Sequence, residues 1–212
     1  MEKIILIGAG GHTKVLIDVI NSKKEFSIEG LIDKEANVEL GGKYSIIGTD
    51  EDLYNIYKDG IKFAFVGVGG LGNLQIRNKI YRNLKDIGYK VPVLIHENSI
   101  VSEYATIDEG TCIMPGCIVN SGVRIGKNSI VNSGAIVEHD CIIGENVHLS
   151  PGSVLGGNVN INNNTHIGLG AKIIQGIKIG KNVTIGAGAV VINDIEDNAV
   201  VVGVPGKIIK FK

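Results

Sequence analysis

One regularity dominates the second half of this sequence: from Ile95 onward every sixth residue is aliphatic, seventeen times in register without a miss. The fourth residue after each anchor is small or β-branched, as at Thr111, Cys117 and Ala135. A period of six matches neither a 3.6-residue helix nor a long alternating strand, but it suits short strands joined by tight corners. The pattern therefore predicts a hexapeptide β-helix whose anchors form interior ladders. The anchors are Ile95, Val101, Ile107, Ile113, Val119, Ile125, Val131, Val137, Ile143, Leu149, Leu155, Ile161, Ile167, Ile173, Ile179, Ile185 and Val191.

Glycine and asparagine precede many anchors, as in IGKNSI and IGKNVT, and they supply the left-handed backbone conformations that tight corners need. No hexad is interrupted, so the predicted coil has no long loop that could reach over a substrate. Asp197 breaks the register, and the tail VVVGVPGKIIKFK is predicted to cap the open end, because an uncapped solenoid would expose unpaired strand edges.

Residues 1–92 read as a small Rossmann-like α/β domain, and residues 93–212 as the β-helix domain. Strands are predicted at KIILIG, IEGLID and KFAFVGVG, and a helix at HTKVLIDVINS. A second, amphipathic helix is predicted over NLQIRNKIYRNLKDIG, with Ile76, Ile80 and Leu84 on its apolar face and Gly88 at its end.

A glycine turn, G-A-G-G at residues 8–11, links the first strand to the first helix, where free N–H groups favour an anionic ligand. The dinucleotide fingerprint requires a third glycine at position 13, which is Thr13, so the pattern disfavours NAD. A mononucleotide or its sugar conjugate is the better candidate ligand.

The net charge and the cysteine content disfavour nucleic-acid-binding, membrane-binding and metal-binding proteins. Lys+Arg 21 against Asp+Glu 22 leaves a net charge of −1, which disfavours nucleic acid and an anionic membrane surface as partners. The three cysteines form no CxxC pair, so we expect buried thiols and no metal site. The N-terminal apolar run of four residues is too short for membrane insertion, and we expect a cytoplasmic protein.

The hexads resemble those of the hexapeptide-repeat acyltransferases, which implies a left-handed parallel β-helix with three hexads per coil. The segments GAGGHTKVLIDVI, GLID, FVGVGG and EHDCIIGENVHLSPGSVLGGNV resemble, over nearly the entire chain, the sugar-nucleotide acetyltransferases typified by the bacillosamine-pathway N-acetyltransferase and its sialic acid O-acetyltransferase relatives. The resemblance implies that the first domain holds the nucleotide of the acceptor. Acetyl-CoA would lie along the β-helix, in the cleft between subunits of a homotrimer.

His139 and Asp140 are the predicted catalytic residues. His139 lies at an outward position of its hexad, and an imidazole is basic near pH 7, as acetyl transfer to an amine requires. The resemblance places the general base at His139 and a supporting acid at Asp140, where many relatives have glutamate. The shorter side chain leaves open whether the carboxylate reaches the ring directly or through a water. The alternative is a surface histidine without a role.

The resemblance assigns contacts with acetyl-CoA to four residues predicted to point outward. The apolar Leu169 and the small Ala187 would let the pantetheine lie flat, and Gly157 would offer a backbone N–H near the thioester. An alternative for each is ordinary coil packing or an exposed bystander. The four are His148, Gly157, Leu169 and Ala187.

For the acceptor, Asp33 matches the first of two acidic residues with which the family binds the nucleotide, and Lys34 replaces the second. That replacement could change the preference for base or sugar. The predicted acceptor-binding residues are Gly10, Gly11, His12, Asp33, Lys34 and Gly69.

These features together predict an acetyl-CoA-dependent N-acetyltransferase of a nucleotide-linked amino sugar, such as a UDP-4-amino-4,6-dideoxy sugar, in surface glycan biosynthesis. Transfer would be direct, with a histidine base and no metal. One alternative is an O-acetyltransferase of sialic or related nonulosonic acids, and another is a non-catalytic β-helix scaffold with a ligand-sensing domain. Aliphatic residues expected to be exposed, among them Ile118, Ile130 and Ile136, predict a homotrimer.

Overall fold

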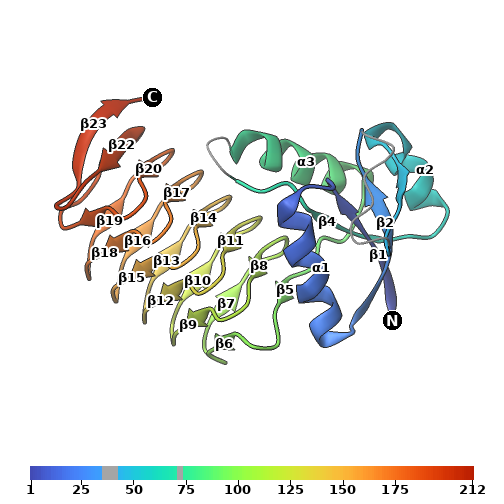
Figure 1. Ribbon diagram of the computed structural model, residues 1–212, viewed down its shortest axis with the longest axis horizontal. Helices are drawn as coiled ribbons and strands as arrows, with labels where there is room; N and C mark the ends of the chain where they lie inside the picture. Colours follow the sequence, from blue (N-terminus) through green and yellow to red (C-terminus); the bar gives the residue numbers. More distant parts are fainter. Residues whose placement is uncertain (35–42, 71–73) are drawn as a thin grey trace.

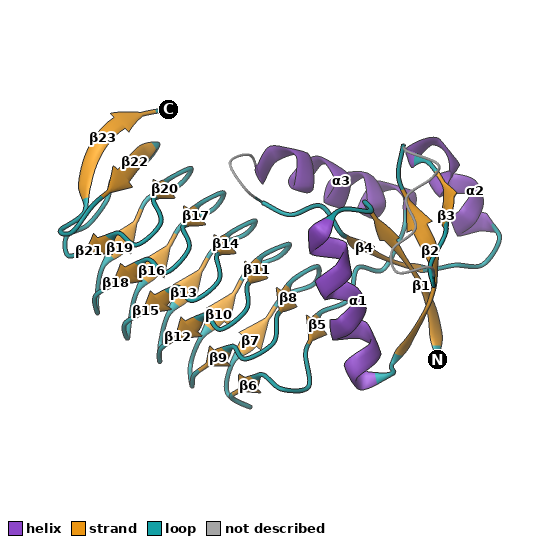
Figure 2. Ribbon diagram, in the orientation of Figure 1, coloured by secondary structure: helices purple, strands orange, loops and turns teal. Residues whose placement is uncertain are grey.

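A computed structural model describes residues 1–34, 43–70 and 74–212 of the chain. An α/β unit holds the N-terminus, and a β-helix extends away from it to the C-terminus at the far end (Figure 1). All helices belong to the first part, and the second consists of strands and turns (Figure 2). The predicted combination of a Rossmann-like α/β domain and a parallel β-helix is confirmed.

The α/β unit is built on a parallel sheet with strand order β3-β2-β1-β4. Its strands are β1 (Glu2–Ile7), β2 (Phe26–Ile32), β3 (Ile46–Gly48) and β4 (Phe63–Val66). Its helices are α1 (Gly11–Lys23), α2 (Leu53–Lys58) and α3 (Leu74–Ile87), with a 3₁₀ turn at Asp50–Asp52. The three predicted strands and both predicted helices are present, whereas the short β3 and α2 were not predicted because neither is long enough to show a period.

The buried face of α3 differs from the prediction. Ile76, expected in the apolar stripe, is 55% exposed, whereas Leu84 is buried as expected. The buried positions are Leu74, Arg77, Tyr81 and Leu84, so an arginine occupies a core position of this helix. The prediction was wrong because it weighed hydrophobicity alone, and a buried arginine can be stabilised only by partners that a sequence does not reveal.

Residues 94–191 form seventeen two-residue strands, in each of which the first residue points outward and the second is an anchor of the hexad repeat. Each strand pairs in parallel with the strand three further along, which gives a prism with three faces. Face 1 holds β5 (Leu94–Ile95), β8 (Cys112–Ile113), β11 (Ile130–Val131), β14 (His148–Leu149), β17 (His166–Ile167) and β20 (Thr184–Ile185). Face 2 holds β6 (Ile100–Val101), β9 (Ile118–Val119), β12 (Ile136–Val137), β15 (Val154–Leu155), β18 (Lys172–Ile173) and β21 (Val190–Val191). Face 3 holds β7 (Thr106–Ile107), β10 (Arg124–Ile125), β13 (Ile142–Ile143), β16 (Asn160–Ile161) and β19 (Lys178–Ile179).

The corner between faces 3 and 1 carries a column of asparagines with left-handed backbone. Asn128 and Asn146 have φ of 55° and 54°, and the amide of Asn128 donates to Asn146 Oδ1 at 3.1 Å. Asn146 in turn donates to Asn164 at 2.8 Å. The predicted use of asparagine at tight corners is therefore confirmed.

The C-terminal tail caps the β-helix, as predicted. β22 (Ala199–Val202) continues face 1 by pairing with β20, and β23 (Lys207–Phe211) folds back on it in antiparallel fashion. The hairpin therefore covers the edge that the last coil would otherwise leave unpaired.

The α/β unit packs on face 1, and this corrects one expectation. Ile130 is fully buried in the single chain, because its outward side chain lies beneath that unit. Ile118 and Ile136, on face 2, are half-buried in the single chain. In the described part of the chain, no helix is both long and apolar enough to cross a membrane.

Candidate active site

His139 and Asp140 form a pair at the corner between faces 2 and 3, just after β12. Their side chains are 63% and 67% exposed, and His139 Nδ1 lies 2.9 Å from Asp140 Oδ2. Asp140 has a left-handed φ of 60°, which turns its carboxylate back toward the ring. The aspartate therefore reaches the imidazole directly, without a bridging water.

Two glycines in the neighbouring coils leave room for this pair. Gly157 stands eighteen residues after His139, and a Cβ at Gly157 would lie 2.6 Å from His139 Nε2. Gly122 stands eighteen residues before Asp140, whose carboxylate occupies the space that a side chain would need. One coil is three hexads, or eighteen residues. The sequence therefore already places Gly157 one coil after His139 and Gly122 one coil before Asp140.

The contact with Asp140 determines which ring nitrogen of His139 carries the proton. A carboxylate accepts the Nδ1–H of His139, which leaves the lone pair on Nε2, the nitrogen beside the backbone of Gly157. A lone pair on an exposed Nε2, supported by a carboxylate behind it, can remove a proton from a bound nucleophile. The geometry is compatible with the predicted general base, and that role stays a prediction.

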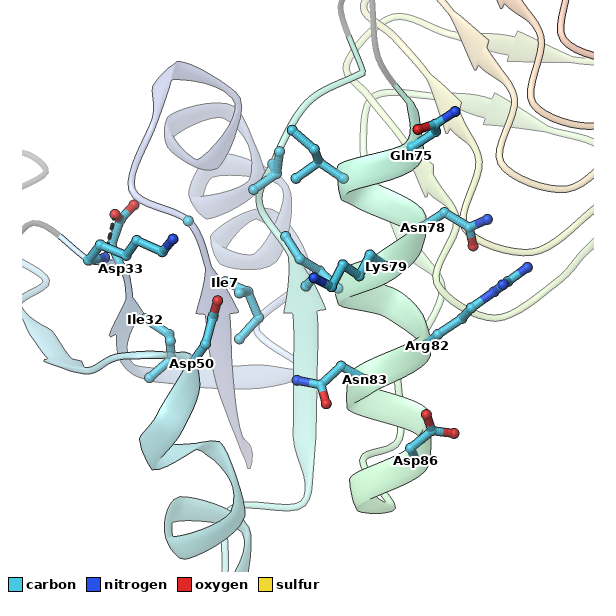
Figure 3. A pocket seen from close by; sticks show the side chains of 15 residues that line it. Ile7, Ile32, Asp33, Asp50, Gln75, Asn78, Lys79, Arg82, Asn83 and Asp86 are labelled. Atoms are coloured by element: carbon cyan, nitrogen blue, oxygen red, sulfur yellow. Dashed lines mark hydrogen bonds between the residues drawn. The ribbon is translucent and has the colours of Figure 1, made fainter.

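The α/β unit contains a cavity of about 1050 Å³ between the carboxyl ends of β1 and β2 and the side of α3 (Figure 3). Parallel sheets commonly bind ligands at this edge. Lys79 and Asn83 extend from α3 toward the strands, while Arg82 points to the other side of the helix. The lining residues are Ile7, Gly8, Ile32, Asp33, Lys34, Asp50, Val68, Gln75, Ile76, Asn78, Lys79, Ile80, Arg82, Asn83 and Asp86.

Two of the predicted acceptor residues, Asp33 and Lys34, line this cavity. The carboxylate of Asp33 accepts the backbone N–H of Ala9 and that of Lys34, each at 2.7 Å, so it also orders the glycine turn. Gly10 and Gly11 are exposed, and a Cβ at either would meet nothing within 4 Å, so the protein leaves this surface open.

The sequence did not single out α3 as part of the cavity. Lys79, Asn83 and the exposed Ile76 come from this helix, and Asp50 comes from the 3₁₀ turn before α2. A weak signal existed, since Ile76 and Lys79 lie three residues apart and so share one face of a helix. Only packing determined which face of α3 meets the sheet.

His12 and Gly69, also predicted acceptor residues, lie side by side: a Cβ at Gly69 would be 3.6 Å from His12 Cβ. Burial and the nearby charge of Arg77 lower the pKa of His12 to about 3, so its ring is neutral at pH 7. Its Nε2 is buried and makes no hydrogen bond within the described part of the chain.

His148 does not have the exposed position that the sequence suggested. It projects from face 1, but the α/β unit covers it, so it is only 3% exposed and stacks on His166 with ring centroids 5.1 Å apart. Burial lowers the pKa of His148 to about 4. The predicted contact with acetyl-CoA therefore stays a prediction, and in the single chain this ring faces the turn at Gly70.

The tautomer of His148 follows from its neighbours. The side-chain oxygen of Asn132 accepts the N–H of Ser133 at 2.8 Å, so the amide nitrogen of Asn132 is the group facing His148 Nε2 at 3.1 Å. Nε2 must then accept, and the proton of the neutral ring lies on Nδ1, which faces Gly70.

The other predicted acetyl-CoA residues lie elsewhere on the prism. Leu169 is 59% exposed and stands, with the exposed Ala187 one coil later, at the corner between faces 1 and 2. Gly157 lies at the next corner, beside His139. One chain therefore does not gather the predicted acetyl-CoA residues into a single pocket.

Two family descriptions match the chain. The PglD N-terminal domain matches residues 3–84, and the bacterial transferase hexapeptide (six repeats) matches residues 122–157. PerB from Caulobacter crescentus, solved in complex with CoA and GDP-perosamine, is 34% identical with a TM-score of 0.92 over 99% of this chain and 98% of that one. The chain belongs to the PglD-type hexapeptide acetyltransferase family.

Other members of this PglD-type family are similarly close. The acetyltransferase domain of PglB from Neisseria gonorrhoeae FA1090, solved with acetyl coenzyme A, is 36% identical with a TM-score of 0.91, over 98% of this chain and 99% of that one. The UDP-N-acetylbacillosamine N-acetyltransferase of Bacillus subtilis (strain 168) is 35% identical over 117 residues, which are 54% of this chain and 52% of that protein. The chain thus matches about half the length of this curated relative. The match to family structures confirms the left-handed parallel β-helix.

In this PglD-type chain, the predicted base His139 and the cavity of the α/β unit lie on different sides of the β-helix. The α/β unit covers face 1, whereas His139 stands at the corner between faces 2 and 3, which is opposite face 1 in a three-sided prism. Among the described residues, no group of three or more His, Cys, Asp or Glu side chains could hold a metal ion.

Proposed function

We propose that this chain is an acetyl-CoA-dependent N-acetyltransferase of a nucleotide-linked amino sugar, such as a UDP-4-amino-4,6-dideoxy sugar, acting in the cytoplasm in surface glycan biosynthesis. Residues 1–92 bind the acceptor, and residues 93–212 supply the base and bind acetyl-CoA. The observation that carries the proposal is the paired base: His139 Nδ1 lies 2.9 Å from Asp140 Oδ2, with Nε2 exposed beside Gly157.

Transfer is direct in this proposal. The sugar amine attacks the thioester carbonyl, His139 Nε2 removes the amine proton, and the same proton passes to the departing CoA thiolate. The N–H of Gly157 makes no hydrogen bond within the described part of the chain, and Gly157 packs against the His139 ring, so this N–H is available to donate to the oxyanion that forms. No covalent intermediate on the protein is required.

The acceptor cavity has the chemistry for a nucleotide diphosphate. Its volume of about 1050 Å³ is slightly above the usual range of small-molecule sites, about 300–1,000 Å³, and so suits a large ligand. Lys79 and Lys34 bring positive charge to it for a diphosphate, and Asp50 and Asn83 bring groups that can bind ribose or base. The exposed Ile76 offers an apolar wall.

The site is completed between subunits of a homotrimer in this proposal, because His139 of one chain lies on the side opposite to its own acceptor cavity. Ile100 and Ile142, outward on faces 2 and 3, are 67% and 48% exposed in the single chain, and association would bury them. Sedimentation equilibrium at micromolar protein is expected to give three times the chain mass of 22.5 kDa. An active species of monomer mass would refute assembly as a requirement.

Acetyl transfer is tested by following CoA release from acetyl-CoA with UDP-, GDP- and dTDP-linked 4-amino sugars, and with free nonulosonic acids. At least one nucleotide-linked amino sugar is expected to gain one acetyl group by mass, on nitrogen. Acetylation of the nonulosonic acids alone would favour the O-acetyltransferase alternative. Absence of CoA release with every acceptor would favour a non-catalytic scaffold.

A further inference from the structure

The largest fully buried side chain among the described residues is that of Arg77, on the inner face of α3. It has no carboxylate partner within 4.0 Å among the described residues, although burial of an unpaired charge is expensive. A methionine could fill the same volume without burying a charge. The guanidinium must therefore do something that an apolar side chain cannot.

The guanidinium joins three separate backbone segments through four carbonyl groups. Its Nη1 donates to the carbonyls of Val66 at 2.8 Å and Val68 at 3.0 Å, in the turn that follows β4. Its Nε and Nη2 donate to the carbonyls of Asn128 at 3.2 Å and Gly110 at 3.3 Å, in two successive coils of the β-helix. One side chain thus fastens the turn after β4 to the β-helix.

We propose that Arg77 is a positioning residue of the acceptor site: it holds the turn Val66–Gly70, in which Val68 lines the acceptor cavity, and thereby sets the direction of the Gly69 N–H next to that wall. This inference rests on the proposed function, because it names how that site holds its substrate.

The direction of the Gly69 N–H follows from peptide geometry. Across a trans peptide bond the C=O of one residue and the N–H of the next point in opposite directions, and the bond between Val68 and Gly69 is trans. Since the Val68 carbonyl points at Arg77, the Gly69 N–H points away from it. This N–H makes no hydrogen bond within the described part of the chain, and Gly69 lies beside His12.

Other contacts in the part of the chain that the structure describes hold Gly67, at the start of the turn, but not the peptide between Val68 and Gly69. Gly67 packs against the hydroxyl of Thr13, which donates to the carbonyls of Gly8 and Gly67. The N–H of Gly67 donates to the carbonyl of Ile7 at 2.7 Å. Without Arg77, nothing else among the described residues holds the carbonyl of Val68. The peptide between Val68 and Gly69 would then be free to rotate, and the donor would lose its direction.

The test compares Arg77→Met and Arg77→Lys with a matched control, Tyr81→Phe. Tyr81 lies one turn further along the same buried face and donates from its hydroxyl to Glu109 on the β-helix at 2.9 Å, but it does not touch the turn after β4. Arg77→Met is expected to raise the acceptor KM about tenfold to a hundredfold and to leave the acetyl-CoA KM within about twofold. Arg77→Lys, which keeps a charged donor, is expected to fall between Arg77→Met and the parent protein, and Tyr81→Phe to leave both constants unchanged.

Hydrogen–deuterium exchange of the segment 66–70 provides a readout that needs no substrate. Exchange there is expected to rise about tenfold or more in Arg77→Met and to stay unchanged in Tyr81→Phe. Unchanged exchange in a folded Arg77→Met protein, or an equal rise of both KM values in all three variants, overturns the positioning role. Because exchange is independent of turnover, it decides this inference even if the parent protein acetylates no nucleotide-linked amino sugar, a result that would refute the proposed function instead.

Discussion

Replacing His139 with alanine is expected to lower kcat by roughly 10²–10⁴-fold, which is the usual contribution of a general base. The fold is expected to survive, because the His139 side chain is 63% exposed and contributes little to the core. The KM for acetyl-CoA should stay within about twofold, since a base acts on the amine rather than on the thioester. Steady-state kinetics with both substrates varied, together with circular dichroism, measures these effects.

Asp140→Asn is the graded companion of that variant. The amide oxygen can still accept the Nδ1–H of His139, so the tautomer is retained, but the neutral amide no longer stabilises the protonated ring. We expect kcat to fall less than in His139→Ala. Near-normal turnover of His139→Ala would remove His139 from the role of base, and an equal loss in both variants would mean that the carboxylate contributes more than orientation.

Acidification from pH 7 to pH 5 is expected to lower the free energy of unfolding by about 4 kcal/mol, through the two buried histidines at the junction of the two parts. In the folded chain the pKa of His12 is lowered to about 3 and that of His148 to about 4, mainly by burial, from an ordinary value of 6.5. Below pH 6.5 the unfolded chain therefore takes up protons that the folded chain does not. Each histidine costs about 2 kcal/mol at pH 5, and the loss continues until the pH reaches the folded pKa.

Calorimetric unfolding at pH 7, 6 and 5 measures this dependence, and His148→Asn is the matched variant. Removing His148 is expected to reduce the pH dependence by about 2 kcal/mol, while His166, whose pKa burial also lowers, keeps its own contribution. Glu109 does not affect the comparison: burial acts to raise its pKa, but the hydrogen bonds from Lys85 and Tyr81 and the charge of Lys85 outweigh burial, so the pKa is lowered from 4.5 and its contribution is lost only in more acidic solution. A stability that is constant from pH 7 to pH 5 would mean that water or ligand groups reach these rings.

The repeat shows how far a sequence can specify architecture. Seventeen anchors at a period of six predicted the strands, the corners and the cap, because stacking places each anchor on the one three hexads away and every coil repeats the same local requirements. The α/β unit was predicted less completely, since β3 and α2 are short and their stability comes from contacts with β2 and α3.

The outward position of the predicted catalytic pair followed from the sequence for a similar reason. His139 and Asp140 are neighbours in a strictly repeating coil, so their outward position followed from the register, and the structure added only that the carboxylate reaches the ring. The acceptor cavity was not predictable in this way. Asp33 and Lys34 follow a strand end, but Lys79 and Asn83 come from a helix whose orientation depends on packing.

The sequence by itself determined the β-helix, its end, the α/β class of the first part and the outward position of His139, because each depends on interactions that are local or recur at a fixed spacing. Tertiary structure alone decided which face of the prism the α/β unit covers, and with it the burial of Ile130 and His148. It also decided that Arg77 rather than Ile76 enters the core. The physical reason is that these side chains are buried by segments distant in the sequence: Arg77 depends on carbonyl groups from three of them, and His148 is covered by the α/β unit, and no local pattern encodes such contacts.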